Sequence, residues 1–424
     1  MAPDPGIFKP TLTLLAGGAL AQALPLLLAP LLTRLYTPDQ FGHYTLIAAV
    51  AVNVGVIACA RYEYALPLEA DSQRARALLA LCLRVLLVVS LLCVPVAWAL
   101  SWGQPGSGWL WLPAVVATAG AAQCLTMWAT RAQRFGALAG ARVTQYGGAA
   151  LAQAGAGLSA PAAALGGQGL IAAPVLANLA TLAFLHRPAP DGGWRSLWRL
   201  PRAEWLAAAR EHRSFPLLNA PHAFNGALQD TLTVLLLTWW SGDAAVGYWG
   251  LVMRCLKAPA TLVGSAVSQV LYPRLASSGP AESRRAVRQV MAMLLLIGTA
   301  LAVLLMVAGP ALFAALFGEP WREAGELSRA LAPYIAMHFV ASPLAVVTLA
   351  WKAQGWALRL ALVGQVVFLA AVAIGLHLGG LQGAAWAVSA AMLPYFGFYF
   401  WSLARWPLPA PEPEPEPNAS ANPT

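Results

Sequence analysis

The ionisable side chains inside the apolar stretches of this sequence are the first candidates for chemistry. Asp230 lies in the middle of one apolar segment, and Arg254 and Lys257 lie three residues apart in the next. In lipid, such a group costs about 3 kcal/mol unless it faces a water-filled cavity or a partner. We therefore expect Asp230 either to form a static salt bridge with Arg254 or Lys257, or to bind a proton or another cation that couples a transport cycle.

A row of polar side chains precedes Asp230 on the same segment. Asn219, His222, Asn225 and Gln229 recur at i, i+3, i+6 and i+10, which places them along one face of an α-helix. Because amides are disfavoured on a face that contacts lipid, this face is predicted to line a wet interior. Amide groups also donate to and accept from hydroxyls, which are the groups that sugars present.

Three further arginines lie at or near the ends of apolar segments. Arg34 follows the first segment, Arg61 closes the second beside Glu63, and Arg84 lies about two turns inside the third. Arg61 either forms a local ion pair with Glu63, or marks the topology, or serves as a handle for a phosphate that crosses the membrane. Arg84 either extends to the nearer membrane face or joins the same set of cations.

The sequence carries no motif for covalent or metal chemistry. It has no P-loop, no D-x-D acidic pair and no hydrolase or transferase constellation. Its five cysteines form no C-x-x-C pair and its six histidines are scattered. We therefore predict a protein that is not an enzyme, has no catalytic residue and needs neither a cofactor nor a metal ion.

Composition places the chain in a membrane. Of its 424 residues, 59% are hydrophobic and 10% are charged, whereas a soluble protein carries about 25% charged residues. Runs of about 20 apolar residues predict an all-α polytopic membrane protein with about twelve transmembrane helices. The first run is too long for a cleavable signal peptide. The expected spans are 11–33, 42–62, 77–100, 109–129, 141–159, 165–185, 216–240, 246–272, 289–316, 330–350, 357–378 and 381–403.

The distribution of positive charge predicts the orientation. Most of the 26 lysines and arginines fall in loops on one side of the expected spans, and the opposite loops contain Arg34, Arg322 and Arg329. Positively charged loops remain in the cytoplasm, so both termini are predicted to be cytoplasmic. The net charge of +9 is then a topology signal, and nucleic acid is not an expected partner.

The longest internal loop divides the spans into two sets of six. We expect a cytoplasmic N-terminus (1–10), a first lobe (11–185), a cytoplasmic interfacial linker (186–215), a second lobe (216–403) and a disordered Pro/Glu tail (404–424). The linker alternates tryptophans with arginines, which suits a short helix lying on anionic lipids. Docking of a protein partner is the alternative role for it.

A weak internal repeat suggests how the two halves are related. Gly42 aligns with Gly247, and Pro67 aligns with Pro273 at nearly the same offset. Because each half has an even number of spans, the repeat is parallel rather than inverted. We therefore expect two parallel six-helix lobes around a central cavity that opens to either side of the membrane.

Two segments also resemble a known family. The sequence RLYTPDQFGHY at 34–44 resembles the first outside turn of Wzx-type O-antigen and exopolysaccharide flippases, and RYEYAL at 61–66 resembles the end of their second helix. The start of the second half, with VGY at 246–248 and YPRL at 272–275, is similar to the corresponding region in that family. The family lies within the multidrug/oligosaccharidyl-lipid/polysaccharide exporter superfamily.

The resemblance implies a substrate and a location. It implies an oligosaccharide on undecaprenyl pyrophosphate, moved from the cytoplasmic to the periplasmic leaflet of a bacterial inner membrane, with a polysaccharide polymerase or chain-length regulator as protein partner. The drive would come from H⁺ or Na⁺, with Asp230 as the coupling residue. The pyrophosphate and the sugars would meet the predicted cations and amides, which are Arg34, Arg61, Arg84, Arg254, Lys257, Asn219, Asn225 and Gln229.

Two other functions are compatible with the predicted fold. A drug or small-solute cation antiporter of the same superfamily would have an apolar cavity with one or two acids, instead of a cationic one. A membrane-embedded polysaccharide polymerase or ligase would need a large outside loop with catalytic residues, whereas the outside loops predicted here are short.

Overall fold

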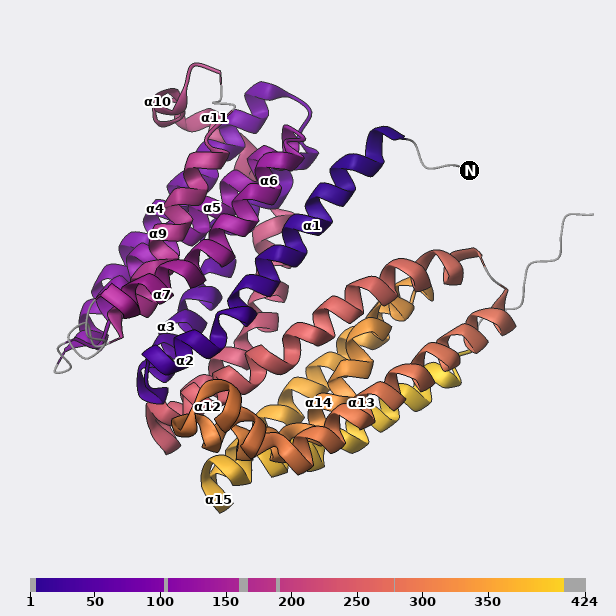
Figure 1. Cartoon of the computed structure of the whole chain (residues 1–424). Helices are drawn as coiled ribbons and strands as arrows, with labels where there is room; N and C mark the ends of the chain where they lie inside the picture. The colour runs from indigo at the N-terminus through magenta and orange to yellow at the C-terminus, as the bar shows by residue number, and fades with distance from the viewer. Residues whose placement is uncertain (1–4, 103–105, 160–166, 188–190, 278, 408–424) are drawn as a thin grey trace, which may run out of the picture.

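The computed structural model describes residues 5–102, 106–159, 167–187, 191–277 and 279–407, and all regular secondary structure in these ranges is helical (Figure 1). The predicted tail beyond residue 407 lies outside them. The first half contains α1 (Pro5–Leu27), α2 (Ala29–Leu35), α3 (Pro38–Ile57), α4 (Ser72–Ser101), α5 (Leu112–Arg131), α6 (Phe135–Arg142), α7 (Ala149–Ser159) and α9 (Gln168–Leu185). The rest contains α10 (Trp194–Trp198), α11 (Arg202–Glu211), α12 (Ala220–Ser277), α13 (Pro280–Phe317), α14 (Arg322–Ala350) and α15 (Gln354–Ala404).

Tighter and wider turns connect some of these helices. The segments η1 (Tyr62–Leu68), η2 (Trp109–Trp111) and η5 (Glu319–Trp321) are 3-10 helical. The segments η3 (Val143–Gly148) and η4 (Phe215–Asn219) are π-helical. In η4 the wider turn immediately precedes α12, so the polar row predicted on that helix begins at an irregular backbone.

Eight of the described helices are long and apolar enough to cross a membrane. Two of the longest helices are each two rods joined at glycine. The break in α12 is at Gly242, with φ 78° and ψ −179°, and the break in α15 is at Gly379 and Gly380. Gly242 and Gly380 have positive φ, which a glycine adopts without the strain of a side chain. The predicted all-α polytopic membrane fold is confirmed.

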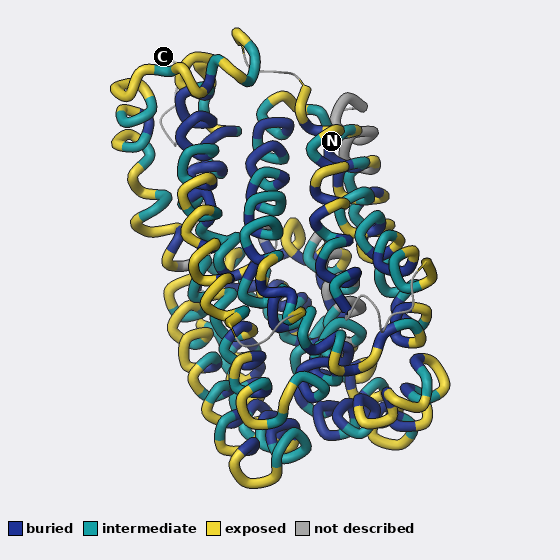
Figure 2. The backbone as a smooth tube through the Cα atoms, turned by 90° about the vertical axis from the view of Figure 1, so that its left-hand side faces the viewer, coloured by how far each residue is buried: buried dark blue, intermediate teal, exposed yellow. Residues whose placement is uncertain are grey.

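The helices form two lobes. One lobe contains α1 to α9 and the other contains α13 to α15 with the second rod of α12 (Figure 1). The lobes meet at the end where α2 finishes and α12 reverses, and they diverge toward the end that carries α10 and α11. A 90° turn of the view shows buried residues running along the inner sides of the helices and exposed residues covering much of the outside (Figure 2).

The start of α3 determines which of its residues reach the contact between the lobes. Thr37 caps this helix: its hydroxyl accepts from the Gln40 amide at 3.4 Å, and the Gln40 side chain accepts from the Thr37 amide at 3.1 Å. Pro38 occupies the first helical position, where no hydrogen bond from its nitrogen is needed. These local signals fix where α3 begins, and therefore where Gly42 lies along the contact.

At the joined end, α3 and the second rod of α12 cross almost backbone to backbone. A Cβ built on Gly42 would collide with the Asp243 carbonyl, and one built on Gly247 would collide with the Pro38 carbonyl. Only glycine permits this approach. The two glycines that align in the internal repeat therefore meet each other at the contact between the lobes.

Polar contacts reinforce the same end. The indole Nε1 of the fully buried Trp321 donates to the Thr33 carbonyl at 2.9 Å. The Nδ1 of His43 lies 3.2 Å from Asp243 Oδ2, and its Nε2 contacts the Ser107 carbonyl. Each of the first two contacts joins one half of the chain to the other, so this end is closed by hydrogen bonds as well as by packing.

The linker forms two short helices that lie against the first lobe. Leu197 of α10 is buried, and α11 packs on α4. Arg84 of α4 donates to the carbonyls of Leu197 and Trp198 at 3.0 and 3.1 Å, and its guanidinium lies 5.4 Å from the rings of Trp198 and Trp205. The linker is therefore fixed to the first lobe by a side chain from inside a predicted span.

Candidate functional site

Asp230 and Lys257 form an ion pair between the two rods of α12. The reversal at Gly242 folds the rods back on each other, which brings Lys257 Nζ within 3.3 Å of Asp230 Oδ1. The side chain of Asp230 is 73% exposed and that of Lys257 is 35% exposed. Of the two partners that the sequence offered for Asp230, the structure selects Lys257. In the described residues Arg254 has neither an ion pair nor a hydrogen bond.

The pair lies at the edge of the seam between the lobes. Thr231, next to Asp230, accepts from Asn53 Nδ2 at 3.0 Å and donates to the Ala49 carbonyl at 3.1 Å. Asn53 and Ala49 belong to α3, so this stretch of α12 touches the other half of the chain. Asp230 is thus exposed beside a polar contact between the two halves of the chain.

Two side chains near Asp230 were not recognised from the sequence. Tyr334 and His338 of α14 have ring centroids 5.9 Å apart, and both interact electrostatically with Asp230. His338 also interacts with Lys257. They are one helical turn apart in the chain, but nothing in that spacing indicates which helix they face. Only the fold shows that a histidine accompanies the acid–base pair.

Arg61 and Asn219 form a second polar contact between the halves. Arg61 Nε donates to Asn219 Oδ1 at 2.9 Å, and its guanidinium lies 4.3 Å above the Tyr64 ring. Arg61 has φ 63° and follows Ala60 at φ 50°, so two non-glycine residues hold a left-handed turn here. That turn is strained, and it directs the arginine toward η4. Two predicted binding residues, 158 positions apart, are thus in direct contact.

The remaining amides of the polar row are partly engaged. Asn225 Nδ2 donates to Gln365 Oε1 at 3.1 Å, and Gln365 Nε2 donates to the Asn225 carbonyl at 3.2 Å. The side chain of Gln229 is half-buried. The side chain of His222 lies outside the described part of the structure. Gln365 of α15 is a further amide at this site that the sequence did not single out.

The other two predicted cations lie elsewhere. Arg84 is engaged by the linker, as described above. Arg34 is exposed at the end of α2, at the joined end of the lobes. The structure therefore brings neither of them to Asp230, Lys257 or Arg61. It makes two separate contacts, the Asp230–Lys257 pair within α12 and the Arg61–Asn219 hydrogen bond between the residue before η1 and η4.

Glu63 follows Arg61 but does not pair with it in the described structure. Its side chain is only 3% exposed, and its Oε2 has no hydrogen-bond partner among the described residues. Burial raises the pKa of this carboxyl to about 7, and the nearby positive charge of Arg61 opposes the shift only in part. Glu63 is therefore a buried carboxyl that titrates near neutral pH, which the sequence alone did not reveal.

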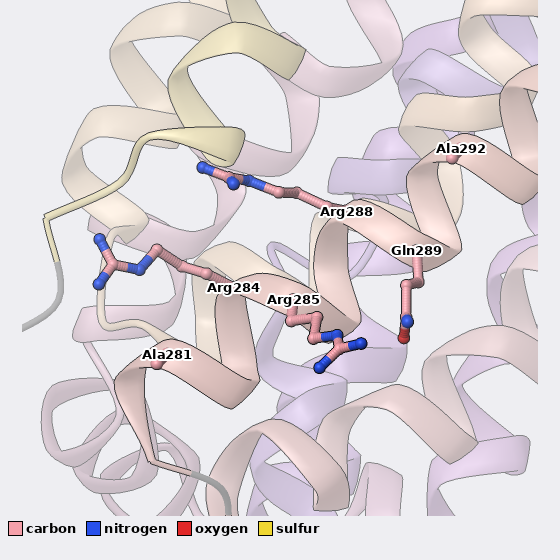
Figure 3. Close-up of a pocket in the computed structure, with 6 residues that line it drawn as sticks. All are labelled: Ala281, Arg284, Arg285, Arg288, Gln289 and Ala292. Atoms are coloured by element: carbon pink, nitrogen blue, oxygen red, sulfur yellow. The ribbon is translucent and has the colours of Figure 1, made fainter.

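Arginines also gather at the start of α13. Arg284 and Arg288 point to one side of this helix, and Arg285 points with Gln289 to another (Figure 3). Arg288 Nε donates to the Ala404 carbonyl at 3.1 Å, which ties α13 to the end of α15. These side chains diverge from a single helix and form an open surface, so they do not enclose a ligand.

Fold and sequence together define a class. The structure is that of a multi-pass, all-α membrane protein with two helical lobes. The chain belongs to the family described as "Polysaccharide biosynthesis protein", whose profile matches residues 31–326. No curated protein matches the chain.

Solved transporter structures share this fold. An inward-facing multidrug resistance MATE family transporter of the MOP superfamily is 12% identical, with 90% of this chain and 93% of that chain covered and a TM-score of 0.61. The lipid II flippase MurJ in an inward closed conformation is 10% identical, with 93% and 90% covered and a TM-score of 0.61. A MOP superfamily transporter from Pyrococcus furiosus is 13% identical, with 93% and 94% covered and a TM-score of 0.55. These likenesses are of fold.

Proposed function

We propose that the protein is a flippase that moves undecaprenyl-pyrophosphate-linked oligosaccharide units from the cytoplasmic to the periplasmic leaflet, for O-antigen or exopolysaccharide synthesis. Family membership supports a role in polysaccharide synthesis. The observation that carries the proposal concerns Arg254, which lies three residues before Lys257 on the same rod of α12 and has no ion-pair or hydrogen-bond partner among the described residues. A membrane-embedded arginine without a partner is costly unless an anionic ligand compensates it.

The chemistry of the substrate matches this group. A pyrophosphate requires cations, and arginine binds phosphate oxygens through several N–H groups at once. Arg254 and Arg61 are assigned to the pyrophosphate. Asn219, Asn225 and Gln229 are assigned to sugar hydroxyls, which amides both donate to and accept from. The polyprenyl tail remains in the hydrocarbon, where it needs no protein groups.

The proposed cycle is one of alternating access. The divergent end carries the linker and, by the positive-inside distribution, faces the cytoplasm. Substrate enters there while Gly42 and Gly247 hold the other end closed. Separation at the glycine crossing and closure of the divergent end then release the glycan outside. The cation that drives this step, H⁺ or Na⁺, acts at Asp230 and competes with Lys257 for its carboxylate.

A cation antiporter is the second candidate. The observation that favours it is the 73% exposure of Asp230, because a single accessible acid is what a cationic drug would bind. The two functions differ in their need for Arg254. A cationic ligand would be repelled by that arginine, whereas a pyrophosphate would be held by it.

The deciding experiment replaces the unpartnered arginine. In a bacterium that depends on this protein for glycan display, Arg254→Ala and Arg61→Ala are expected to abolish surface glycan while the protein remains in the membrane. Arg359→Ala is the matched control, because Arg359 is exposed near the start of α15 and has no ion pair or hydrogen bond among the described residues. Full display in both test variants contradicts the pyrophosphate assignment. If the protein confers drug resistance, and Arg254→Ala keeps that resistance without losing surface glycan, the antiporter is favoured instead.

A further inference from the structure

A second cluster of ligand-bearing side chains lies at the linker end of the molecule, outside the predicted spans. Glu69 precedes α4, and Glu211 and His212 stand at the end of α11. One ligand atom from each of the three lies within 4.8 Å of the other two. The side chains of Glu69 and His212 are only 11% and 18% exposed, whereas that of Glu211 is 50% exposed. The cluster is thus largely enclosed, with one carboxylate open to solvent.

One pair within the cluster has the spacing of two ligands on one metal ion. His212 Nε2 lies 3.6 Å from Glu69 Oε2, which is longer than an N–H···O hydrogen bond of about 2.7–3.2 Å. Two ligand atoms that each lie about 2.0–2.2 Å from one tetrahedral Zn²⁺ are separated by about 3.3–3.6 Å. The imidazole and the carboxylate therefore stand as two corners of a coordination site, too far apart to share a proton directly.

The backbone on the Glu69 side is held by hydrogen bonds. Arg131 Nε donates to the Glu69 carbonyl at 2.9 Å, and another guanidinium nitrogen of Arg131 donates to the Ala70 carbonyl at 3.0 Å. The Asp71 amide donates to Glu69 Oε1 at 3.2 Å, which leaves Oε2 directed at His212. Outer contacts that orient a ligand in this way are typical of metal sites.

The linker side is held as well. The Tyr62 hydroxyl donates to the Ala209 carbonyl at 3.2 Å, which fixes the last turn of α11. The His212 ring packs edge-on against Phe215, with centroids 6.2 Å apart. Hydrogen bonds to the backbone and ring packing therefore position both halves of the cluster.

The local charge leaves room for a cation. Arg74 lies 3.3 Å from Glu211 Oε1 and 3.8 Å from Asp71 Oδ2, and its side chain is 62% exposed. It contacts only one oxygen of Glu211, so the other oxygen remains available. The three carboxylates of Glu69, Asp71 and Glu211 outnumber the two guanidinium groups of Arg74 and Arg131 that contact this segment, so a bound cation would offset the remaining negative charge.

We propose that Glu69, Glu211 and His212 bind one divalent transition-metal ion, best matched by Zn²⁺, with water completing its coordination. One nitrogen and two carboxylate oxygens form a ligand set that zinc accepts. The ion cross-links the end of the linker to the segment that follows the second span, and so holds α11 on the first lobe. The absence of a metal motif in the sequence is consistent with this, because Glu69 and His212 are neighbours only in the fold.

The test uses the full-length protein purified in detergent and stripped with a chelator. Titration with ZnCl₂, followed by calorimetry and thermal unfolding, is expected to show about one bound ion per chain and a higher unfolding temperature. Glu69→Gln and His212→Ala are expected to lose both effects. Zinc binding is expected to weaken as the pH is lowered, because protons compete for the imidazole. The five cysteines are present in every variant, so they contribute only a common background.

The control is His186→Ala, an exposed histidine at the same end of the molecule. It is expected to bind zinc as the unaltered protein does. Glu69→Gln keeps the size of the side chain, and its unfolding in chelator reports whether the fold survives. The proposal is overturned if the unaltered protein does not bind zinc, or if His212→Ala, Glu69→Gln and His186→Ala all bind it equally, which indicates adventitious binding only.

Discussion

Gly42 and Gly247 meet at the contact between the lobes, and each leaves space for the other's main chain. A Cβ on Gly42 would come within 3.0 Å of the Gly247 nitrogen, and a Cβ on Gly247 within 3.2 Å of the Gly42 nitrogen. Both would also collide with a carbonyl of the opposite half. The contact is therefore made by two related positions of the repeat and by backbone alone, so that no side chain can be repacked to relieve a substitution.

The first prediction concerns this crossing. Gly42→Ala and Gly247→Ala force the two backbones apart, and overpacking of this kind costs about 1–3 kcal/mol. We expect a lower unfolding temperature and a loss of glycan transport for both variants. Gly155→Ala is the control, because a Cβ there meets nothing within 4 Å. Normal transport by both variants would show that the lobes do not depend on this close approach.

The second prediction separates a static salt bridge from a coupling site. Because the Asp230 and Lys257 side chains are both substantially exposed, their attraction contributes at most about 1 kcal/mol to stability. Asp230→Asn is therefore expected to leave the unfolding temperature nearly unchanged while it blocks transport and preserves substrate binding. Transport assays in proteoliposomes with an imposed ion gradient measure this directly.

The charge-swapped protein provides the matching control. In Asp230→Lys combined with Lys257→Asp, the pair is retained but the acid moves to the other rod of α12. If the bridge is only structural, the swap restores transport. We expect transport to remain blocked, because an ion-binding carboxylate has to lie beside the lobe seam at Thr231.

The third prediction follows from Glu63. Its pKa is raised from 4.5 to about 7, so the folded state binds a proton that the unfolded state has already lost over this range. Its contribution to stability is complete below pH 4.5 and is lost as the pH rises through 7. The loss is on the order of 3 kcal/mol. Unfolding measured between pH 5 and pH 8 checks this.

Glu63→Gln tests the assignment. The amide cannot ionise, so the variant is expected to lose this part of the pH dependence and to be more stable than the unaltered protein above pH 7. Glu282→Gln is the control, because Glu282 is an exposed carboxyl of α13. An identical profile for Glu63→Gln and the unaltered protein would mean that Glu63 is ionised in the folded state.

The sequence predicted the helices of this fold better than it predicted which residues their side chains contact. Apolar length alone indicated the spans, and the alignment of Gly42 with Gly247 indicated two related lobes. The polar row on α12 was found by its helical period. Periodicity gives the face of a helix, however, and not what that face contacts. For that reason the Asn225–Gln365 contact was not anticipated, and neither was the position of His338 near Asp230.

The same reasoning could not distinguish the roles of similar arginines. Arg61 and Arg84 both lie near the ends of apolar runs. The left-handed backbone at Arg61 directs it to Asn219, whereas Arg84 reaches the carbonyls of Leu197 and Trp198 in the linker. These outcomes depend on contacts more than a hundred positions apart in the chain, which no local pattern contains.

Because Arg84 holds the linker on the first lobe, only a short length of chain is left to connect the two lobes. α10 and α11 are bound to the first lobe. The segment that can change conformation between the two lobes is therefore the π-helical stretch from Phe215 to Asn219. Any movement that carries the start of α12 away from Arg61 requires a change in the helical winding of residues Phe215 to Asn219. The segment from Phe215 to Asn219 would then limit how far the two halves of the protein can separate.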